Sequence, residues 1–387
     1  MAIYENLFSA AVSGSIDCES PPNENVCALL ASVGEFCYII ENSLTMRILA
    51  TLEDVAQRAG TSVATAGRAL GGYGKVASAT RDRVVAAARQ LNYHPNALAR
   101  SMKQRSTFTI GLIIGNICNP FFARIVRAVE TAVRRYGCKV IVCDTDESIE
   151  NELDHARTLL EHRVDGIIAS PTASETGVLS RATKEIYGSK MPTVFIDRAV
   201  KGAKIPTVVS DNIAAAQDAT THFIRLGHKR IGLVVGRRAL DSMTGRIEGY
   251  RRALLEHRIT FDESLVVDAV DVGVVAGYHA TKKLIERNHR PTALIVMNNL
   301  LVIGALNAIK EERLKIPGDL ALIGWDDFDA APHLQKPLTV VEQPADAMGS
   351  IAAEQLMKMR SGEAVDPSLH IVLKSTLIIR ESSEKRI

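Results

Sequence analysis

The chain has 387 residues, with 46 Lys and Arg against 44 Asp and Glu, and a formal net charge of +2. Its six cysteines include no C-x-x-C pair, which argues against a zinc site or a thioredoxin-like redox site. The apolar run 26–40 is broken by Glu35 and is too short to span a bilayer, so we expect a cytoplasmic protein with reduced thiols and no membrane partner.

Charge is distributed unevenly along the chain. Residues 1–45 hold six acidic residues and no Lys or Arg. Residues 46–105 hold ten Lys or Arg against three acidic residues, a local net charge of +7. Positive charge concentrated in one segment indicates where a polyanion such as DNA would dock. A basic run taken alone is more often a solvated helical surface, so the helix pattern has to decide between the two.

The segment after Thr51 has the pattern of two short helices separated by a tight turn. The first helix places four apolar side chains on one face, at i, i+3, i+4 and i+7: Leu52, Val55, Ala56 and Ala59. Thr51 followed by Asp54 resembles a capping box, and Gly60 tolerates the positive φ at which a helix ends. Ser62 can cap the second helix, residues 63–70. Helices joined by so short a turn cross steeply, which predicts a helix-turn-helix.

A third helix and a hinge follow this pair. The helix is expected at about residues 80–91 and closes a small core with Val84, Val85, Ala88 and Leu91. It ends before Pro95, because a residue that precedes proline is pushed out of the α region. Asn96 can cap the next segment, 97–103, but seven residues are too few for a stable isolated helix. We expect residues 94–106 to be a hinge that orders only on DNA; a plain linker is the alternative.

The stretch T-L-E-D-V-A-Q-R-A-G-T-S-V-A-T-A-G-R-A-L resembles the head of the LacI/GalR family of bacterial transcription regulators, and the resemblance extends over residues 50–382. In that family the second helix enters the major groove of an operator. Carried over by position, the residues that face base edges are Val63, Ala64 and Arg68. The implied phosphate contacts are Ser62, Thr65, Thr80 and Tyr93, and the implied hinge contacts are Asn96, Ala99 and Met102. Met102 stands where a leucine usually wedges between base steps in the minor groove.

The base-facing helix also departs from the family pattern. Arg68 can donate a fork to guanine, whereas the apolar residues beside it can only touch a thymine methyl, so direct readout depends on Arg68. Gly67 should destabilise the helix by about 1 kcal/mol relative to alanine. Gly71 and Ala77 replace polar residues of the family, so the phosphate contacts at these two positions are not carried over.

The resemblance also bears on the first 45 residues. The family's head starts a few residues after its initiator methionine, and Met46 holds that position here. Residues 1–45 lack the basic start of a signal peptide. We therefore expect them to be disordered, or to lie upstream of the true start, and expect the head to cover residues 46–93.

Beyond the hinge, residues 107–382 alternate short apolar runs with helical stretches, the order of parallel sheets flanked by helices. About 280 residues are too many for one small core, so we expect two α/β lobes. The expected strands are 108–114, 139–145, 166–170, 192–197, 207–211, 230–236, 293–297, 321–326 and 370–379. The expected helices include 121–136, 213–226, 244–257 and 300–312. The expected lobes are 107–198 with 341–366, and 199–340 with 367–382.

Polar residues gather just after these strands, where ligands sit in open α/β sheets. The pattern is similar, position by position, to the periplasmic ribose-binding proteins, which implies a type I bilobed body. The equivalents of ten residues line a monosaccharide cleft there: Asn119, Phe121, Phe122, Asp197, Arg198, Asn212, Arg246, Asn298, Asp326 and Gln343. Each alone is better explained as loop capping, but together they predict a sugar pocket that favours a ribose-like pentose. Asn299 replaces the family's aspartate, and Trp325 its smaller aromatic ring.

The combined pattern predicts an all-α helix-turn-helix head on an α/β bilobed body with two parallel sheets. We expect a homodimeric repressor that binds a roughly palindromic operator and responds to a sugar, with dimer contacts from helices 122–136 and 281–288. No phosphate-loop, zinc-protease or serine-hydrolase motif occurs, so no enzyme activity, cofactor or metal is expected. A sugar receptor for transport would need export, and a sugar-processing enzyme using Asp197 and Asp326 would need a nucleophile.

Overall fold

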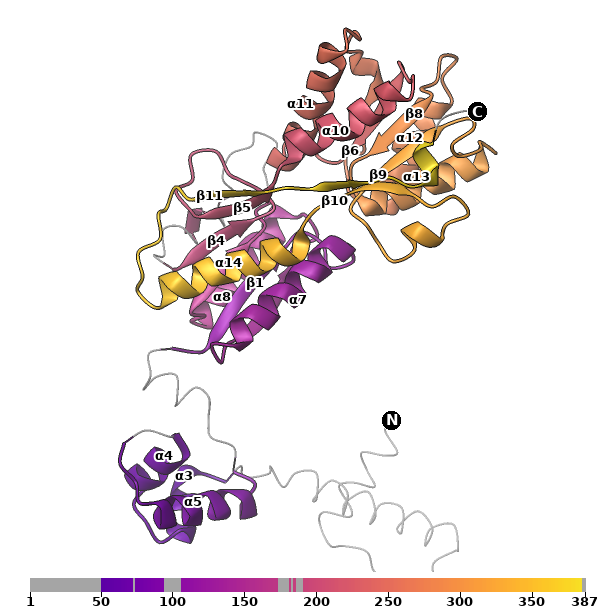
Figure 1. Cartoon of the computed structure of the whole chain (residues 1–387). Helices are drawn as coiled ribbons and strands as arrows, with labels where there is room; N and C mark the ends of the chain where they lie inside the picture. The colour runs from indigo at the N-terminus through magenta and orange to yellow at the C-terminus, as the bar shows by residue number, and fades with distance from the viewer. Residues whose placement is uncertain are drawn as a thin grey trace, which may run out of the picture. The chain divides into compact units, whose positions relative to one another are not determined.

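The computed structural model describes residues 50–71, 74–93, 106–172, 181, 184–185 and 191–384. The expected extension, residues 1–45, lies outside the described residues. So does the expected hinge apart from Ser106, and with it the predicted contact residues Asn96, Ala99 and Met102. The chain divides into two units between residues 96 and 97. Each unit is described by itself (Figure 1).

The described residues of the first unit form three short helices: α3 (Leu52–Arg58), α4 (Val63–Gly71) and α5 (Ser78–Gln90). The predicted capping box is present at the start of α3. The Thr51 hydroxyl accepts a hydrogen bond from the Asp54 backbone N at 3.2 Å, and the Asp54 carboxylate accepts one from the Thr51 backbone N at 2.8 Å. Gly60 follows with φ +60°, which only glycine adopts without strain.

A small core of alanine and valine holds these helices together. Its buried members are Val55, Ala56, Ala59, Ala66, Ala69, Val84, Ala87 and Ala88. Small side chains let the three helices approach closely, and this core is what orients the exposed face of α4. Val85 and Leu91, which were expected in the core, are only half-buried, because Ala87 takes the inward position between them.

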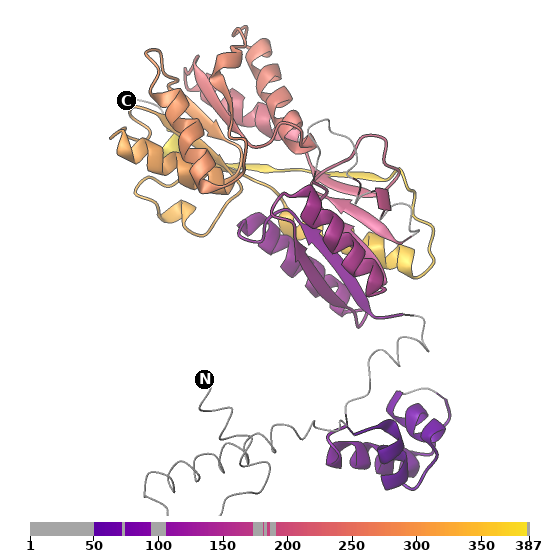
Figure 2. The same ribbon diagram turned by 180° about the vertical axis from the view of Figure 1, so that it is seen from behind.

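The second unit contains two sheets of six strands each. The first sheet has the order β11-β5-β4-β3-β1-β2, and every pairing in it is parallel. Its strands are β1 (Thr109–Ile114), β2 (Lys139–Asp144), β3 (Gly166–Ala169), β4 (Thr193–Ile196), β5 (Thr207–Ser210) and β11 (His370–Leu373). Helices α7 (Pro120–Arg134) and α14 (Ala345–Arg360) lie side by side over one face (Figure 1). Helix α8 (Ile149–Glu161) covers the other face (Figure 2).

The second sheet has the order β12-β10-β9-β8-β6-β7. Its strands are β6 (Ile231–Val235), β7 (Val266–Asp268), β8 (Ala293–Val296), β9 (Ala321–Trp325), β10 (Thr339–Glu342) and β12 (Thr376–Ile378). Helices α10 (Asn212–Arg225) and α11 (Asp241–Glu256) pack on one face, and α12 (Val274–Ile285) and α13 (Asn299–Glu311) pack on the other. Three single-turn 3-10 helices complete the chain: Glu263–Leu265, Ala331–His333 and Glu381–Ser383.

The predicted elements need three corrections. Strands β7 and β10 were not expected, since each is a run of only three or four residues. The single strand expected at 370–379 is two strands, because the chain leaves the first sheet at Lys374-Ser375 and continues in the second (Figure 1). Strand β12 pairs antiparallel with β10, so the second sheet is mixed rather than wholly parallel.

The expected lobe boundaries are also wrong at three places. Strand β5 belongs to the first sheet, because it pairs with β4 in parallel register. Strand β11 belongs to the same sheet, because it pairs with β5. Strand β10 belongs to the second sheet, because it pairs with β9. The chain therefore crosses between the lobes after β5, after β10 and after β11, a few residues later than expected in each case.

Candidate functional site

A pocket lies at the carboxyl ends of strands from both sheets. Nine of the ten predicted residues line it: Asn119, Phe121, Phe122, Asp197, Arg198, Arg246, Asn298, Asp326 and Gln343. The tenth, Asn212, does not line the pocket but lies behind Arg246, whose Nε donates to the Asn212 side-chain oxygen at 2.8 Å. The sequence pattern therefore located the pocket, and only the role of Asn212 changes, from a lining residue to a positioning residue.

Arg198 is held through its two terminal nitrogens, whereas its buried Nε makes no hydrogen bond. Its two terminal nitrogens form a bidentate pair with the Glu147 carboxylate, at 2.8 and 2.5 Å. Nη1 also donates to the Pro171 carbonyl at 3.3 Å, and Nε lies 3.2 Å from the Asp197 carboxylate. Burial is the largest single influence and lowers the pKa of Arg198, but the charge and hydrogen bonds of Glu147, together with the charges of Asp197 and Glu152, raise it overall, so the guanidinium stays charged.

Arg246, on α11, is the second buried guanidinium of the pocket. Besides its bond to Asn212, its Nη1 donates to the Met297 carbonyl at 2.7 Å. Its Cζ lies 4.2 Å from the centroid of the Trp325 ring, a cation–π contact. Burial lowers the pKa of Arg246 to about 10, which still leaves it protonated near neutral pH. The remaining N–H groups give the pocket a fixed, planar hydrogen-bond donor.

Two aspartates complete the charged lining. The Gln343 amide donates to Asp326 at 2.7 Å, and its carbonyl accepts from the Ser210 hydroxyl at 2.5 Å. Burial raises the pKa of Asp326 to about 6, and burial also raises that of Asp197. Both aspartates adopt the left-handed backbone region, with φ 65° and 70°. Such conformations are concentrated at functional sites, where the surrounding structure holds them in place.

Direct hydrogen bonds join the two lobes across the pocket. The Asn299 amide, from α13, donates to the side-chain oxygen of Asn119 at 2.9 Å, and that oxygen also caps α7 by accepting from the Phe121 backbone N at 2.8 Å. Arg237 donates to the Glu147 backbone carbonyl at 2.6 Å. The space left in the pocket is about 30 Å³, close to the volume of one water. A sugar therefore needs the lobes or the arginine side chains to move before it can enter.

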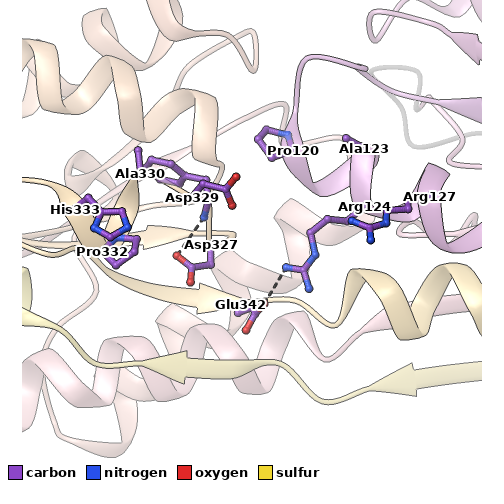
Figure 3. Close-up of a pocket in the computed structure, with 11 residues that line it drawn as sticks. Pro120, Ala123, Arg124, Arg127, Asp327, Asp329, Ala330, Pro332, His333 and Glu342 are labelled. Atoms are coloured by element: carbon purple, nitrogen blue, oxygen red, sulfur yellow. Dashed lines mark hydrogen bonds and ion pairs between the residues drawn. The ribbon is translucent and has the colours of Figure 1, made fainter.

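A larger opening of about 970 Å³ lies on another side of the lobe boundary, lined by α7 and by the loop after β9 (Figure 3). Arg124 spans it, with Nη1 2.8 Å from the Glu342 carboxylate and Nη2 2.6 Å from that of Asp346. Asp327 is held by Arg380 at 2.6 Å. Arg124 and Glu342 are thus paired with each other across the opening, and Asp327 is paired with an arginine that does not line it.

Sequence reasoning missed seven residues that line the pocket: Asn116, Glu147, Leu240, Ser242, Met243, Val272 and Leu300. The rule that ligands sit beyond strand ends could have found Glu147, which follows β2 by three residues. The apolar residues carried no signal of their own, because nothing in their spacing separates pocket lining from core packing. Trp325, expected to reshape the pocket, is fully buried behind Arg246 and does not line it.

The exposed face of α4 carries the predicted DNA-reading residues. Ser62 accepts from the Thr65 backbone N at 3.2 Å, and its hydroxyl lies 2.9 Å from that of Thr65. Val63 is 40% exposed, and Ala64 and Arg68 are also exposed. Arg68 folds back along its own helix, where Nε donates to the Ala64 carbonyl at 3.3 Å. Such a long bond releases easily, so the guanidinium is available to another acceptor.

Thr80 and Tyr93 lie farther along the first unit. Both are half-buried, and Tyr93 packs against the alanine and valine core. Within the part of the chain that the structure describes, no cluster of His, Cys, Asp and Glu is arranged to hold a metal ion. No helix among the same residues is long and apolar enough to cross a membrane.

Two family models match the chain. Residues 51–96 match the lacI family of bacterial regulatory proteins, and residues 220–383 match a periplasmic binding protein-like domain. A transcriptional repressor named PurR from Photobacterium profundum is 31% identical over 310 residues, covering 80% of this chain and 92% of the relative. A transcriptional repressor named CytR from Escherichia coli K12 is 32% identical over 334 residues, covering 86% and 96%.

Solved structures of transcription regulators also match the chain. The lac repressor dimer bound to operator and the anti-inducer ONPF is 25% identical, with a TM-score of 0.75, and the match covers 86% of this chain and 98% of that one. A regulator from Enterococcus faecium with bound ribose is 25% identical, with a TM-score of 0.62, covering 71% and 98%. The match to the repressor dimer includes the segment of the three-helix unit as well as the body.

Proposed function

Since the chain belongs to the lacI family of bacterial regulatory proteins, we propose that it is a transcriptional repressor whose affinity for operator DNA is set by a ribose-like pentose bound between the two lobes. The observation that carries the proposal is the meeting of nine predicted residues in one pocket, from loops spread over more than 200 positions of the chain.

The chemistry of the pocket suits a small polyhydroxylated ligand. Arg246 presents planar donors, Asp197 and Asp326 accept, and the edge-to-face pair Phe121–Phe122 supplies an apolar wall for C–H groups. Of the similar structures, one regulator holds ribose and another, described as CelR, is a complex with cellobiose. These two complexes support a sugar ligand, and the ribose complex supports a pentose.

A homodimer is the second part of the proposal. The lac repressor that matches this chain is a dimer on its operator. The body exposes apolar side chains on the edge strand β2, at Ile141 and Val142, and near the start of α12, at Val270 and Val275. Val270 and Val275 are 77% and 70% exposed, which is unusual for valine. These patches are better candidates for the dimer contact than helices 122–136 and 281–288, whose apolar side chains mostly face their own core.

The test is a gel-shift titration of the purified protein with DNA from upstream of its own gene, alone and with D-ribose, other pentoses, hexoses and purines. The proposal requires tight binding to one fragment over random duplex and a pentose-dependent change in that affinity. A response to a purine with none to any pentose would replace the sugar assignment. Sugar binding without DNA preference would instead indicate a receptor, and consumption of the sugar would indicate an enzyme.

A further inference from the structure

The pocket contains one buried carboxylate that the polar inventory of a sugar site does not explain. Glu147 is 2% exposed and stands on the loop after β2, with its carboxylate turned toward Arg198 rather than toward the open space. Its backbone is in the left-handed region, with φ 58°. A side chain held in this way, with its backbone under strain, points to a specific task.

We infer that Glu147 is a specificity-determining residue that occupies Arg198 internally and so restricts the pocket to uncharged ligands. The inference rests on the proposed sugar-binding function and deepens it, because it names the charge class of the ligand. Two terminal nitrogens of Arg198 are bonded to Glu147, and Nη1 is also bonded to the Pro171 carbonyl. Little of the guanidinium remains for the phosphate or carboxylate of a ligand.

The charge balance of the lining supports the same conclusion. Three carboxylates, Glu147, Asp197 and Asp326, face two guanidinium groups, Arg198 and Arg246. When all five groups are ionised, the lining has a net charge of −1. Without Glu147 the net charge of the lining would be zero. An anionic ligand would enter a buried site of like charge, which costs affinity. Arg246 alone keeps donors directed at the space, and these are sufficient for hydroxyl groups.

The local backbone is shaped to accommodate this pair. Gly115 follows β1, and a Cβ built there would overlap the Glu147 carboxylate and lie 3.2 Å from Nη2 of Arg198. The Glu147 backbone carbonyl, in turn, accepts from Arg237 of the second lobe at 2.6 Å. One residue thus neutralises an arginine of the first lobe through its side chain and joins the second lobe through its main chain.

The test measures the affinities of D-ribose and D-ribose 5-phosphate by calorimetry for the wild-type protein, for Glu147→Ala and for Glu150→Ala. Glu150 is an exposed acid in the first turn of α8, three residues after Glu147, and serves as the matched control. The wild type and the control should bind the phosphate ester about 100-fold more weakly than ribose, or not at all. Glu147→Ala should reverse or erase that preference, since the freed Arg198 gains an anionic partner. Equal affinity of the wild type for both compounds, or an unchanged preference in Glu147→Ala, would overturn the inference.

Inorganic phosphate provides a readout that does not depend on the sugar. Removal of Glu147 takes the bidentate partner from the buried Arg198 and leaves it the 3.2 Å ion pair with Asp197, so the variant should melt at a lower temperature than the wild type. Phosphate should restore the melting temperature of Glu147→Ala, or its folding if the variant is unfolded, and should leave the wild type and Glu150→Ala unchanged. If the wild type binds no sugar at all, the proposed function fails, while rescue by phosphate still supports the role of Glu147. Absence of rescue overturns that role.

Discussion

The guanidinium of Arg246 lies over the indole of Trp325, with 4.2 Å between Cζ and the ring centroid. Trp325 is the single tryptophan of the chain and is fully buried. Its fluorescence therefore reports on one place only, the back of the pocket. A ligand that bonds to Arg246 changes the field at the indole ring and should shift the emission, which gives a binding signal without a label.

Substitution of Arg246 should uncouple the effector from DNA. In Arg246→Ala we expect the affinity for the effector to fall by about 10- to 100-fold, because two or more charge-assisted hydrogen bonds are lost. Operator binding in the absence of effector should persist. Calorimetry with the effector and a gel shift measure the two activities separately, because the Trp325 signal itself depends on Arg246. Arg252→Ala, an exposed arginine on the same helix, is the control and should change neither.

Substitution of Arg68 should have the opposite effect. Arg68 is the one residue predicted to face the bases that can donate hydrogen bonds, so Arg68→Ala should weaken operator binding by about 1–3 kcal/mol. Effector binding, measured by Trp325 fluorescence, should stay at the wild-type value. Arg89→Ala removes an exposed arginine from the last turn of α5 and serves as control. If Arg89→Ala lost specificity as strongly as Arg68→Ala, base readout could not be assigned to α4.

The contact between Asn119 and Asn299 should be sensitive to a single-atom change. Asn299→Asp replaces the donating amide with a carboxylate that faces the Asn119 oxygen. Asn119 cannot turn its amide to meet it without giving up the cap of α7. We expect the contact to change from attraction to repulsion and the free energy of unfolding to fall by about 1–3 kcal/mol. Urea titration checks this, with Asn307→Asp on the exposed face of the same helix as the control. Equal stability of the two variants would contradict the prediction.

Asp326 should give the unliganded protein a characteristic pH dependence. Burial raises the pKa of Asp326 from its ordinary range to about 6, so the folded state binds this proton more tightly than the unfolded chain does. The contribution of Asp326 to stability is therefore greatest below about pH 4 and is lost as the pH rises to about 6, a change on the order of 3 kcal/mol.

The measurement for Asp326 is the difference in unfolding free energy between the wild type and Asp326→Asn across pH 4–7. The variant cannot ionise at this position, so its stability relative to the wild type should increase over that interval. Asp329→Asn, in the exposed loop that follows β9, should run parallel to the wild type at every pH. A constant difference between the wild type and Asp326→Asn would show that Asp326 does not titrate in this range.

The sequence predicted most of the pocket because its residues follow strands, and the ends of parallel strands meet at one edge of a sheet. This rule needs only the order of elements, so it located Asp197, Asn298 and Asp326 without any knowledge of the lobe boundaries. It could not predict that Arg198 is taken by Glu147, since that pairing depends on side-chain direction after a left-handed turn.

The lobe boundaries were harder to predict for a physical reason. A strand at a sheet edge and a strand that crosses to another sheet have the same apolar pattern. The run 370–379 was therefore expected as one strand, although its two halves pair with β5 and β10 in different sheets. Short strands such as β7 contain too few residues for any period to show.

The last strands of the chain have a consequence for truncated forms of the protein. Strands β11 and β12 lie within ten residues of each other, and each closes an outer edge of a different sheet. A stop codon before His370 would thus remove an edge strand from each sheet and leave unpaired backbone groups on β5 and on β10. Completion of both sheets therefore depends on the same short stretch of chain, residues 370–378.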